Sequence, residues 1–384
     1  MKLKVQPEDF RVEERLNLRL KRAGAYSVYR LEKRLWNTLD VIRHLEQHHG
    51  LRHLARAGLK DRYSHSIQYL SMPGKGPHTI AEKNYSLRLA GMADQPVSRE
   101  ILIGNSFQVR LRALTADEAR AILSALPQVN RFGFPNYYDE QRLGSARHGQ
   151  GFIARKLIDG HFNGALKLWL ATPSSADDSH SRQTKAALER NWGDWKTCLE
   201  LVPPEARPAI EQLCRRAKDF RGAVYLIPRN LLELFINAYQ AWLWNEIMAG
   251  VLADLKVRQR GLEYLLGTLS FYDELTPAQD TYLRRLVIPA PGPGAESTSE
   301  RVMRVTNQVL TREGLSLRQL EPKFRIRGVF FKAYPRTAVV RPERMKASGP
   351  DPDEIYPGRK TLLLSFFLPA GSFATILVKR LSLL

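Results

Sequence analysis

Alternating apolar and polar positions are clearest between Ile101 and Arg112. Phe107, Val109 and Leu111 would lie on one face there, opposite Gln108, Arg110 and Arg112. A period of two residues is typical of a β-strand with one buried face, so this segment predicts such a strand. Residues 361–368 are apolar almost without interruption, which predicts a second strand, covered on both faces.

Helical patterns accompany these strands. A helix is expected just after Asn37, ending near Gly50, because Asn caps helix starts and Gly adopts the left-handed turn that ends helices. Thr115 and Glu118 have the spacing of a capping box and predict the start of another helix. A third helix is expected from about Asn230, with apolar residues at helical spacing: Leu231, Leu234, Phe235, Ala238, Tyr239 and Trp242.

Other segments carry weaker local signals. Residues 172–187 are mostly small and polar, which predicts a loop. Phe330 and Phe331 lie in a strand-like run. Near the end of the chain, Ser372 is expected to cap a last helix.

The order of these elements predicts an α+β protein with two domains. Strand-rich segments at the beginning and end of the chain flank a helical middle. We therefore expect 1–145 and 335–384 to form one discontinuous domain around a mainly antiparallel mixed sheet, and 146–334 to form a helix-rich insertion domain. At 384 residues the chain is long enough to bury a core in each domain.

Charge narrows the choice of partner. Lys and Arg number 59 against 39 Asp and Glu, which gives a formal net charge of +20. Such an excess attracts polyanions, so nucleic acid is the leading partner class. An anionic membrane surface would also suit it, but the sequence offers no basic amphipathic helix with a clean apolar face.

Basic residues are dense near the end of the expected insertion. Residues 301–344 contain 11 Lys and Arg against 3 Asp and Glu. Basic side chains neutralise phosphates, and exposed aromatic rings stack on unpaired bases. The rings of this segment either serve that purpose or belong to the core: Phe324, Phe330, Phe331 and Tyr334.

Cysteine usage and hydropathy indicate the compartment. Cys198 and Cys214 form neither a CxxC pair nor a disulfide framework, which fits a reducing environment. Residues 1–10 have no apolar core of a secretory signal, and the apolar stretch 362–370 is too short to span a bilayer. We expect a soluble, cytoplasmic protein with no membrane partner.

One short segment has the residues of a catalytic site. In Gly58-Leu59-Lys60-Asp61-Arg62 a carboxylate lies between two cations, beside which it stays ionised. An anionic carboxylate suits a nucleophile or a general base. Taken alone, Lys-Asp-Arg is more often a solvated turn with a surface ion pair, so the catalytic interpretation depends on the rest of the chain.

Support comes from five blocks that follow one another along nearly the whole chain. They are residues 4–14 (KVQPEDFRVEE), 58–61 (GLKD), 104–107 (GNSF), 136–144 (NYYDEQRLG) and 368–375 (LPAGSFAT). In sequence and order these blocks resemble the TruD family of tRNA pseudouridine synthases. The resemblance implies a pseudouridine synthase catalytic domain, formed by the two outer segments, and the TRUD insertion domain of that family between them.

The resemblance also implies roles for particular residues. Asp61 would be the catalytic carboxylate, and Lys4 would be a buried lysine paired with it. Asn136 would lie near the target nucleotide, and Tyr138, where the family usually has Phe, would pack its ring on the target base. The remaining expected substrate-binding residues are Lys60, Arg62, Gln68 and Arg142.

The implied reaction converts uridine to pseudouridine in tRNA, usually at position 13, with no cofactor and no metal. A stacked base must be flipped out before an enzyme can reach it. Asp61 would then attack the sugar or remove a sugar proton, and the sequence leaves both routes open.

Two other classes of function stay open. The first is a non-catalytic RNA-binding or tRNA-folding protein on the same scaffold. The second is an RNA-modifying enzyme of another chemistry, such as a methyltransferase or nuclease. The sequence contains neither a nucleotide-cofactor glycine loop nor a cluster of metal-binding carboxylates that this second class would need.

A metal pair is conceivable at His44 and His48, which are four residues apart on an expected helix. The zincin order HExxH is absent, and no third ligand follows at a suitable spacing. We therefore interpret these histidines as an exposed helix terminus, where cations are favourable.

Overall fold

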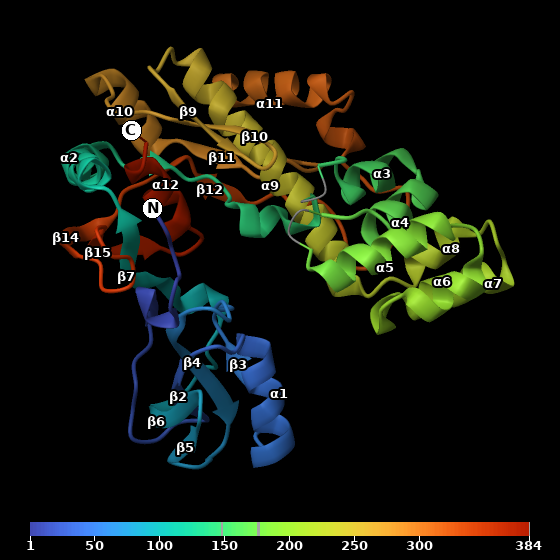
Figure 1. The fold of residues 1–384 in the computed structure, drawn as a ribbon, viewed down its shortest axis with the longest axis horizontal. Coiled ribbons are helices and arrows are strands. Elements are labelled where there is room, and N and C mark those ends of the chain that lie inside the picture. Colours follow the sequence, from blue (N-terminus) through green and yellow to red (C-terminus); the bar gives the residue numbers. More distant parts are fainter. Residues whose placement is uncertain (147–148, 175–176, 384) are drawn as a thin grey trace. The chain divides into compact units, whose positions relative to one another are not determined.

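The computed structural model describes residues 1–146, 149–174 and 177–383 (Figure 1). The chain forms two compact units. The first contains Met1–Phe134 and Val340–Leu384, and the second contains Pro135–Val339. The first unit is therefore discontinuous in sequence. The functional domain boundaries expected near residues 145 and 335 stay a prediction.

A mixed sheet forms the centre of the first unit, as predicted. Its strands run in the order β14-β15-β7-β1-β4-β2-β6-β5, and β3 pairs with β4. β1 pairs with β4 in parallel, and the other pairings described for this sheet are antiparallel. The strands are β1 (Phe10–Leu16), β2 (Tyr26–Lys33), β3 (Ala55–Arg56), β4 (His65–Pro73), β5 (Thr79–Glu82), β6 (Tyr85–Ala93), β7 (Leu102–Leu114), β14 (Glu343–Pro352) and β15 (Lys360–Pro369).

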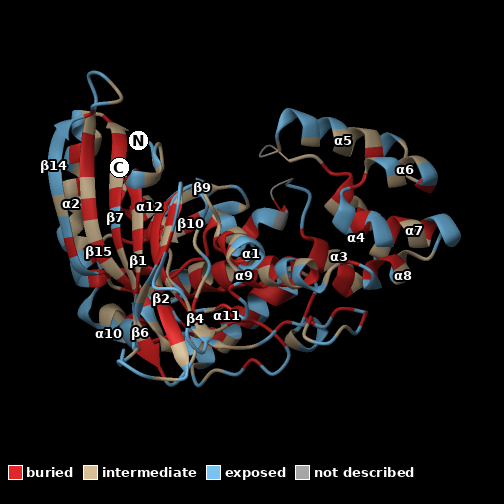
Figure 2. Cartoon of the chain, turned by 90° about the horizontal axis from the view of Figure 1, so that it is seen from below, coloured by how far each residue is buried: buried red, intermediate tan, exposed pale blue. Residues whose placement is uncertain are grey.

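Three helices pack in this unit. α1 (Thr38–His49) buries Val41, Ile42 and Leu45 in a core cluster shared with β2, β4 and β6. α2 (Ala116–Phe132) packs against β7, β14 and β15, and α12 (Ala374–Leu381) packs against α2. Figure 2 shows the buried residues of these elements in red. The short 3-10 helices η1 (Pro7–Asp9) and η2 (Arg99–Ile101) precede β1 and β7.

The expected helix starts in the first unit are confirmed. The Asn37 side chain accepts a hydrogen bond from the backbone N–H of Asp40, and Gly50 ends α1 with a φ of 66°. Thr115 and Glu118 make both hydrogen bonds of the capping box that opens α2.

Two details of the closing segment differ from expectation. β15 contains the predicted strand, but its burial alternates, so one face of it is only partly covered. Phe373, not Ser372, is the N-cap residue of α12, and no side chain caps it by a hydrogen bond. A serine next to a helix start caps it only when its backbone occupies the N-cap position, and here the helix begins one residue later.

The second unit is mainly helical, with α9 as its longest helix, and the predicted helix near residue 230 is confirmed. Its helices are α3 (Ile153–Asp159), α4 (Phe162–Leu170), α5 (Ser179–Arg190), α6 (Trp195–Leu201), α7 (Arg207–Arg215), α8 (Phe220–Tyr225), α9 (Arg229–Asp254), α10 (Pro277–Arg285) and α11 (Glu300–Arg312). Short strands pair as β9 (Arg260–Tyr264) with β10 (Gly267–Phe271) and β11 (Val287–Pro289) with β12 (Pro335–Thr337). At the two points where the chain passes between the units, β8 (Phe134–Pro135) pairs with β13 (Val339–Val340). The 3-10 helices are η3 (Glu140–Ala146), η4 (Pro204–Ala206) and η5 (Leu317–Gln319).

Two local predictions in this unit are wrong. The second half of the expected loop 172–187 belongs to α5, whose start is capped by the side chain of Asp178. α5 buries only Leu188, so its mostly polar sequence is that of an exposed helix. Phe330 and Phe331 lie in irregular backbone before β12 and not in a strand. In the described part of the chain, no helix is long and apolar enough to cross a membrane.

Candidate active site

Asp61 lies in the loop that leads from β3 into β4 in the first unit. Its Oδ2 is 2.6 Å from the Nζ of Lys4, which is the ion pair expected from the sequence. The Asp61 side chain is 42% exposed, so solvent or a substrate can reach the carboxylate. The sequence analysis expected a buried lysine at this position, but 18% of the Lys4 side chain is exposed. Its ammonium also lies 4.3 Å from the centroid of the Phe10 ring, within cation–π range.

Lys33, at the end of β2, holds the backbone of this loop from inside the unit. Its side chain is fully buried. Burial lowers the pKa of its ammonium to about 8, and the charge of Asp61 opposes this shift. Four oxygens lie within hydrogen-bonding distance of Nζ: the carbonyls of Trp36 (2.7 Å), Asp61 (2.9 Å) and Lys60 (3.3 Å), and Oγ of Ser66 (3.3 Å). The ammonium therefore fixes the path of the chain on both sides of the Lys60–Asp61 peptide.

The Lys60 side chain points into the first unit. Its Nζ donates to Oδ1 of Asn105 at 2.6 Å and lies 3.1 Å from Oε1 of Glu14. The Lys60 side chain is 8% exposed and that of Glu14 is fully buried, so this is a buried ion pair. A role of Lys60 in contacting RNA stays a prediction, whereas its contacts anchor the loop to β1 and β7.

Thr38, the first residue of α1, links the loop to the sheet. Its Oγ1 accepts a hydrogen bond from the backbone N–H of Lys60 at 2.9 Å and donates to Oε1 of Gln68 at 2.8 Å. Gln68 is fully buried. Its expected contact with substrate stays a prediction. Its observed hydrogen bond with Thr38 supports the start of α1, which holds the loop.

The exposed side of the loop contacts two neighbouring segments. Nε of Arg62 donates to the carbonyl of Leu35 at 3.0 Å, and the hydroxyl of Tyr63 donates to the carbonyl of Val5 at 3.1 Å. The Tyr63 contact holds the N-terminal segment that carries Lys4. Arg62 directly follows Asp61 in the chain and is exposed. Its expected contact with RNA stays a prediction.

In the second unit, Asn136 follows β8 and is buried. Its Nδ2 donates to the carbonyl of Thr337 at 3.2 Å, and its backbone N–H donates to the carbonyl of Ala338 at 2.8 Å. The guanidinium of Arg336 donates to the Asn136 carbonyl at 2.6 Å and to its Oδ1 at 2.8 Å. These hydrogen bonds fix both the backbone and the amide of Asn136.

Tyr138 is packed by side chains of α9 and β12. The guanidinium carbon of Arg336 lies 3.9 Å from the centroid of its ring, and the Trp244 ring packs edge-on at 5.7 Å. Asn245 exchanges two hydrogen bonds with the Tyr138 backbone, and the hydroxyls of Tyr138 and Tyr334 are 2.6 Å apart. Burial raises the pKa of the Tyr138 hydroxyl well above its usual range, and the charge of Arg336 opposes this only in part. The hydroxyl is therefore neutral at physiological pH.

Arg142 lies in η3, which follows Tyr138. Its backbone N–H donates to the carbonyl of Asp139 at 2.8 Å. Its charge is close enough to lower the pKa of Tyr138, against the larger effect of burial. A positive charge near Tyr138 suits an anionic ligand, and the expected contact of Arg142 with RNA stays a prediction.

The aromatic residues of the basic segment 301–344 separate into two groups. Phe324 and Phe331 are buried and belong to the core of the second unit. Phe330 is 54% exposed, and Tyr334 contacts Tyr138 through its hydroxyl. Of these four rings that of Phe330 is the most exposed, which makes it the first candidate for stacking on a base.

Lys33 and Arg336 are two residues of these sites that the sequence analysis did not identify. Lys33 ends a strand as one lysine among many, and nothing local distinguishes a buried lysine from a solvated one. Arg336 belongs to the basic segment but was not singled out there. Both side chains satisfy backbone carbonyls that only the folded chain brings together.

The family model described as tRNA pseudouridine synthase D (TruD) matches residues 1–261. A tRNA pseudouridine synthase D of Aquifex aeolicus is 30% identical over 392 residues, covering 99% of this chain and 98% of the relative. The protein named "Probable tRNA pseudouridine synthase D 1" of Methanococcus maripaludis is 29% identical over 391 residues, covering 99% of each chain.

A solved structure supports the fold. The crystal structure of a protein named "Putative tRNA pseudouridine synthase D (TruD)" from Methanosarcina mazei matches with a TM-score of 0.73 and 23% identity, covering 100% of this chain and 93% of that one. The two relatives span almost the entire chain, and the family model matches most of it. The chain belongs to the TruD family of tRNA pseudouridine synthases.

Proposed function

We propose that this enzyme isomerises a uridine of tRNA, at position 13, through Asp61 as the catalytic carboxylate. The observation that carries the proposal is the geometry of the loop. An accessible carboxylate is ion-paired with Lys4, while Lys33 binds its backbone carbonyl from the interior. An aspartate held by one contact to its carboxylate and another to its backbone is ready to act at a single atom of a bound substrate.

Catalysis begins with extrusion of the target nucleotide from its stack. In one route, an Asp61 oxygen bonds to the sugar carbon C1′ as the glycosidic C1′–N1 bond breaks and its electron pair passes to the uracil. In the other, Asp61 takes the C2′ proton as the same bond breaks, which gives a glycal. The uracil then rotates and C1′ bonds to C5. In the first route the bond between Asp61 and C1′ breaks as this bond forms, and in the second Asp61 returns the proton to C2′. C5 loses its proton and N1 gains one. All atoms of the product come from the uridine, so the reaction consumes no second substrate.

Lys4 and Lys33 have different roles in this proposal. The Lys4 ammonium stabilises the anionic form of Asp61 through direct contact and opposes repulsion by RNA phosphates. Lys33 acts on the backbone and sets the direction in which the carboxylate points. Lys60, Gln68 and Thr38 support the loop from beneath, so we assign them positioning roles.

Residues of the second unit would bind the target nucleotide. Asn136, Tyr138 and Arg142 supply an amide, an aromatic ring and a cation, the groups that recognise base edges, base faces and phosphates. Tyr138 is only 5% exposed, and Arg336 covers one face of its ring. We therefore expect the Tyr138–Arg336 stack to open locally when the flipped base enters.

The test is Asp61→Asn. General acid–base and nucleophilic groups contribute about 10²–10⁴-fold, so we expect the rate of pseudouridine formation to fall by about 1000-fold or more. Mass spectrometry of tRNA incubated with the enzyme measures the product, and filter binding measures the affinity for tRNA, which should be unchanged. Asp94→Asn is the matched control, because Asp94 is an exposed, ion-paired carboxylate of the same unit.

The outcomes separate this proposal from a non-catalytic RNA-binding function. If the wild-type protein binds tRNA but forms no pseudouridine, the binding function is correct and the enzymatic proposal fails. If Asp61→Asn keeps wild-type activity, the role of Asp61 is wrong even though the enzyme is active. Sequencing the modified tRNA tests position 13 separately.

A further inference from the structure

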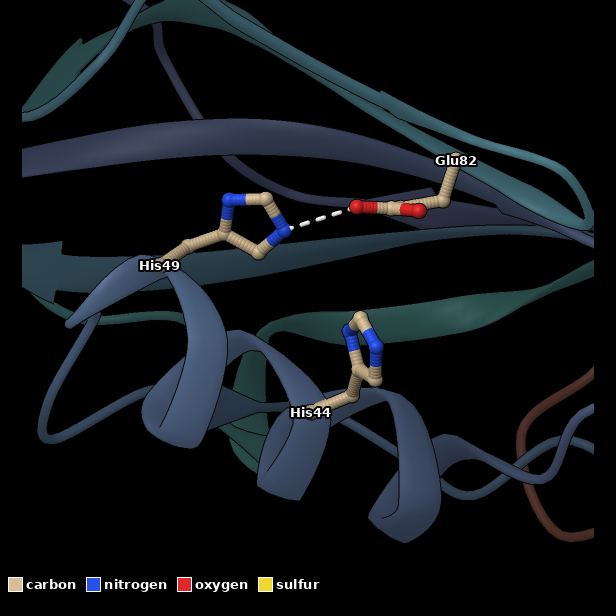
Figure 3. A group of neighbouring side chains, drawn as sticks. All are labelled: His44, His49 and Glu82. Carbon is tan, nitrogen blue, oxygen red and sulfur yellow. Dashed lines mark hydrogen bonds and ion pairs between the residues drawn. The ribbon is translucent and has the colours of Figure 1, made fainter.

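Two histidines of α1 and a glutamate of β5 lie together on the first unit (Figure 3). His44, His49 and Glu82 each offer one ligand atom, and these atoms all lie within 4.8 Å of one another. Nε2 of His49 is already 2.9 Å from Oε1 of Glu82. Two imidazoles and one carboxylate are a donor set that Zn²⁺ uses in proteins.

The fold places these ligands at the junction of two elements. His49 is the last residue of α1, and Gly50 is its C-cap. Glu82 is the last residue of β5, at the turn into β6, and pairs with Tyr85 across this hairpin. The carbonyl groups at the end of a helix carry partial negative charge, which favours a cation at this end of α1.

The surroundings of His44 orient its ring for binding. Nδ1 of His44 lies 2.8 Å from the hydroxyl of Tyr85. In the tautomer whose Nδ1–H donates to that hydroxyl, Nε2 carries the lone pair that a metal needs. The rings of Trp36 and Tyr85 pack edge-on against the imidazole.

Small side-chain movements would bring these three ligand atoms to the distances of a tetrahedral site. With metal–ligand bonds of about 2.0–2.1 Å, tetrahedral ligand atoms lie about 3.3 Å apart. The contact between His49 and Glu82 needs only a slight opening, and the proton they share would leave on binding. His44 closes the site by rotation of its side chain, and water would complete the coordination.

We propose that His44, His49 and Glu82 bind one Zn²⁺ per chain, at a site that does not depend on the isomerisation chemistry. The bound ion would tie the end of α1 to the β5–β6 hairpin. The opposite end of α1 begins with Thr38, which holds the backbone N–H of Lys60. Metal binding would therefore stabilise the helix that supports the catalytic loop.

This site differs from the His44–His48 pair conceivable from the sequence. The His48 ring stacks on that of His44, with centroids 4.2 Å apart, and its Nδ1 faces the carbonyl of His44. The third ligand that the local sequence lacked comes from Glu82, 33 residues beyond His49 and on a different element. The two arrangements predict different effects of mutation.

Calorimetric titration of metal-free, full-length protein with Zn²⁺ tests the proposal. We expect one ion per chain, and visible absorption of tetrahedral Co²⁺ after substitution. His49→Ala and Glu82→Gln should each weaken binding by about 100-fold or more, because each removes a ligand. Tyr85→Phe should weaken it by about 10-fold, since it removes the hydrogen bond that orients His44.

His48→Ala is the matched control, on the same helix and equally polar, and it should keep wild-type affinity. If Glu82→Gln binds Zn²⁺ as tightly as the wild type, or if His48→Ala loses as much affinity as His49→Ala, a histidine-only surface chelate replaces the proposed site. Failure to bind one equivalent also overturns it. Asp61→Asn should still bind Zn²⁺, so this result is separate from the proposed catalysis. Thermal unfolding in a chelator checks that each variant folds.

Discussion

Lys33 carries a cost that its contacts must offset. Removing an ammonium from water is expensive, and it is tolerated only when acceptors replace the water. Three of the four acceptors of Lys33 are backbone carbonyls, and two of these belong to Lys60 and Asp61. The buried ammonium therefore holds the backbone of one loop in place, which makes Lys33 a positioning residue for Asp61.

Lys33→Met should separate positioning from binding. A misplacement of about 1 Å at a reacting group can cost about 100-fold in rate, so we expect kcat to fall by about that factor with KM nearly unchanged. Single-turnover and steady-state assays of pseudouridine formation measure both. Lys21→Met, at an exposed ion-paired lysine, is the control. A folded Lys33→Met protein with wild-type kcat would contradict the role.

The wild type and Lys33→Met should also differ in how their free energies of unfolding depend on pH. The folded pKa of Lys33, about 8, lies below the ordinary value of 10.5, so the unfolded chain binds this proton more tightly. The resulting penalty is complete below pH 8 and is relieved as the pH rises from 8 toward 10.5. Wild-type stability should therefore increase relative to Lys33→Met over that range, as urea unfolding at several pH values would measure.

At the residue scale, an ion pair could be predicted from the sequence, whereas the burial of individual side chains could not. The pairing of Lys4 with Asp61 was expected through family resemblance and is confirmed. The burial of Lys33 and the packing of Arg336 on Tyr138 were not expected, because both depend on contacts between distant segments. Such contacts leave no periodic or spacing signal in the chain.

At the scale of elements, signals confined to a few neighbouring residues were the reliable ones. The capping residues of α1 and α2 and the alternation in β7 predicted these elements, since each depends on local hydrogen bonds or one buried face. Phe330 and Phe331 were misassigned because two adjacent apolar residues fit a strand and an irregular segment equally well. The polar helix α5 was missed for the converse reason, a lack of buried positions.

Thr115→Ala tests the contribution of one such signal. The Thr115 hydroxyl accepts a hydrogen bond from the backbone N–H of Glu118 at 3.1 Å. Loss of an N-cap lowers the free energy of unfolding by about 1 kcal/mol. We expect a lower urea midpoint for unfolding of the first unit. Ser124→Ala, an exposed serine within α2, should be neutral or slightly stabilising, because alanine favours helix. Equal midpoints for wild type and Thr115→Ala would show that tertiary packing alone holds α2.

At the scale of the whole molecule, the net charge of +20 governs encounter with RNA. Binding releases counterions from the phosphates, so the logarithm of tRNA affinity should fall linearly with the logarithm of salt concentration. Between 50 and 200 mM salt we expect a loss of at least about 10-fold, measured by filter binding. Asp61→Asn should have the same slope. A salt-independent affinity would mean that contacts other than phosphate neutralisation dominate.

The discontinuity of the first unit has a consequence for synthesis on the ribosome. β7 is complete at Leu114, but its partner β15 begins at Lys360, after the whole second unit has been made. At about 5–20 residues per second, one edge of β7 waits for about 10 s or longer. An unpaired strand edge invites pairing with other chains. The nascent protein is thus most vulnerable to aggregation in the interval before its last segment emerges.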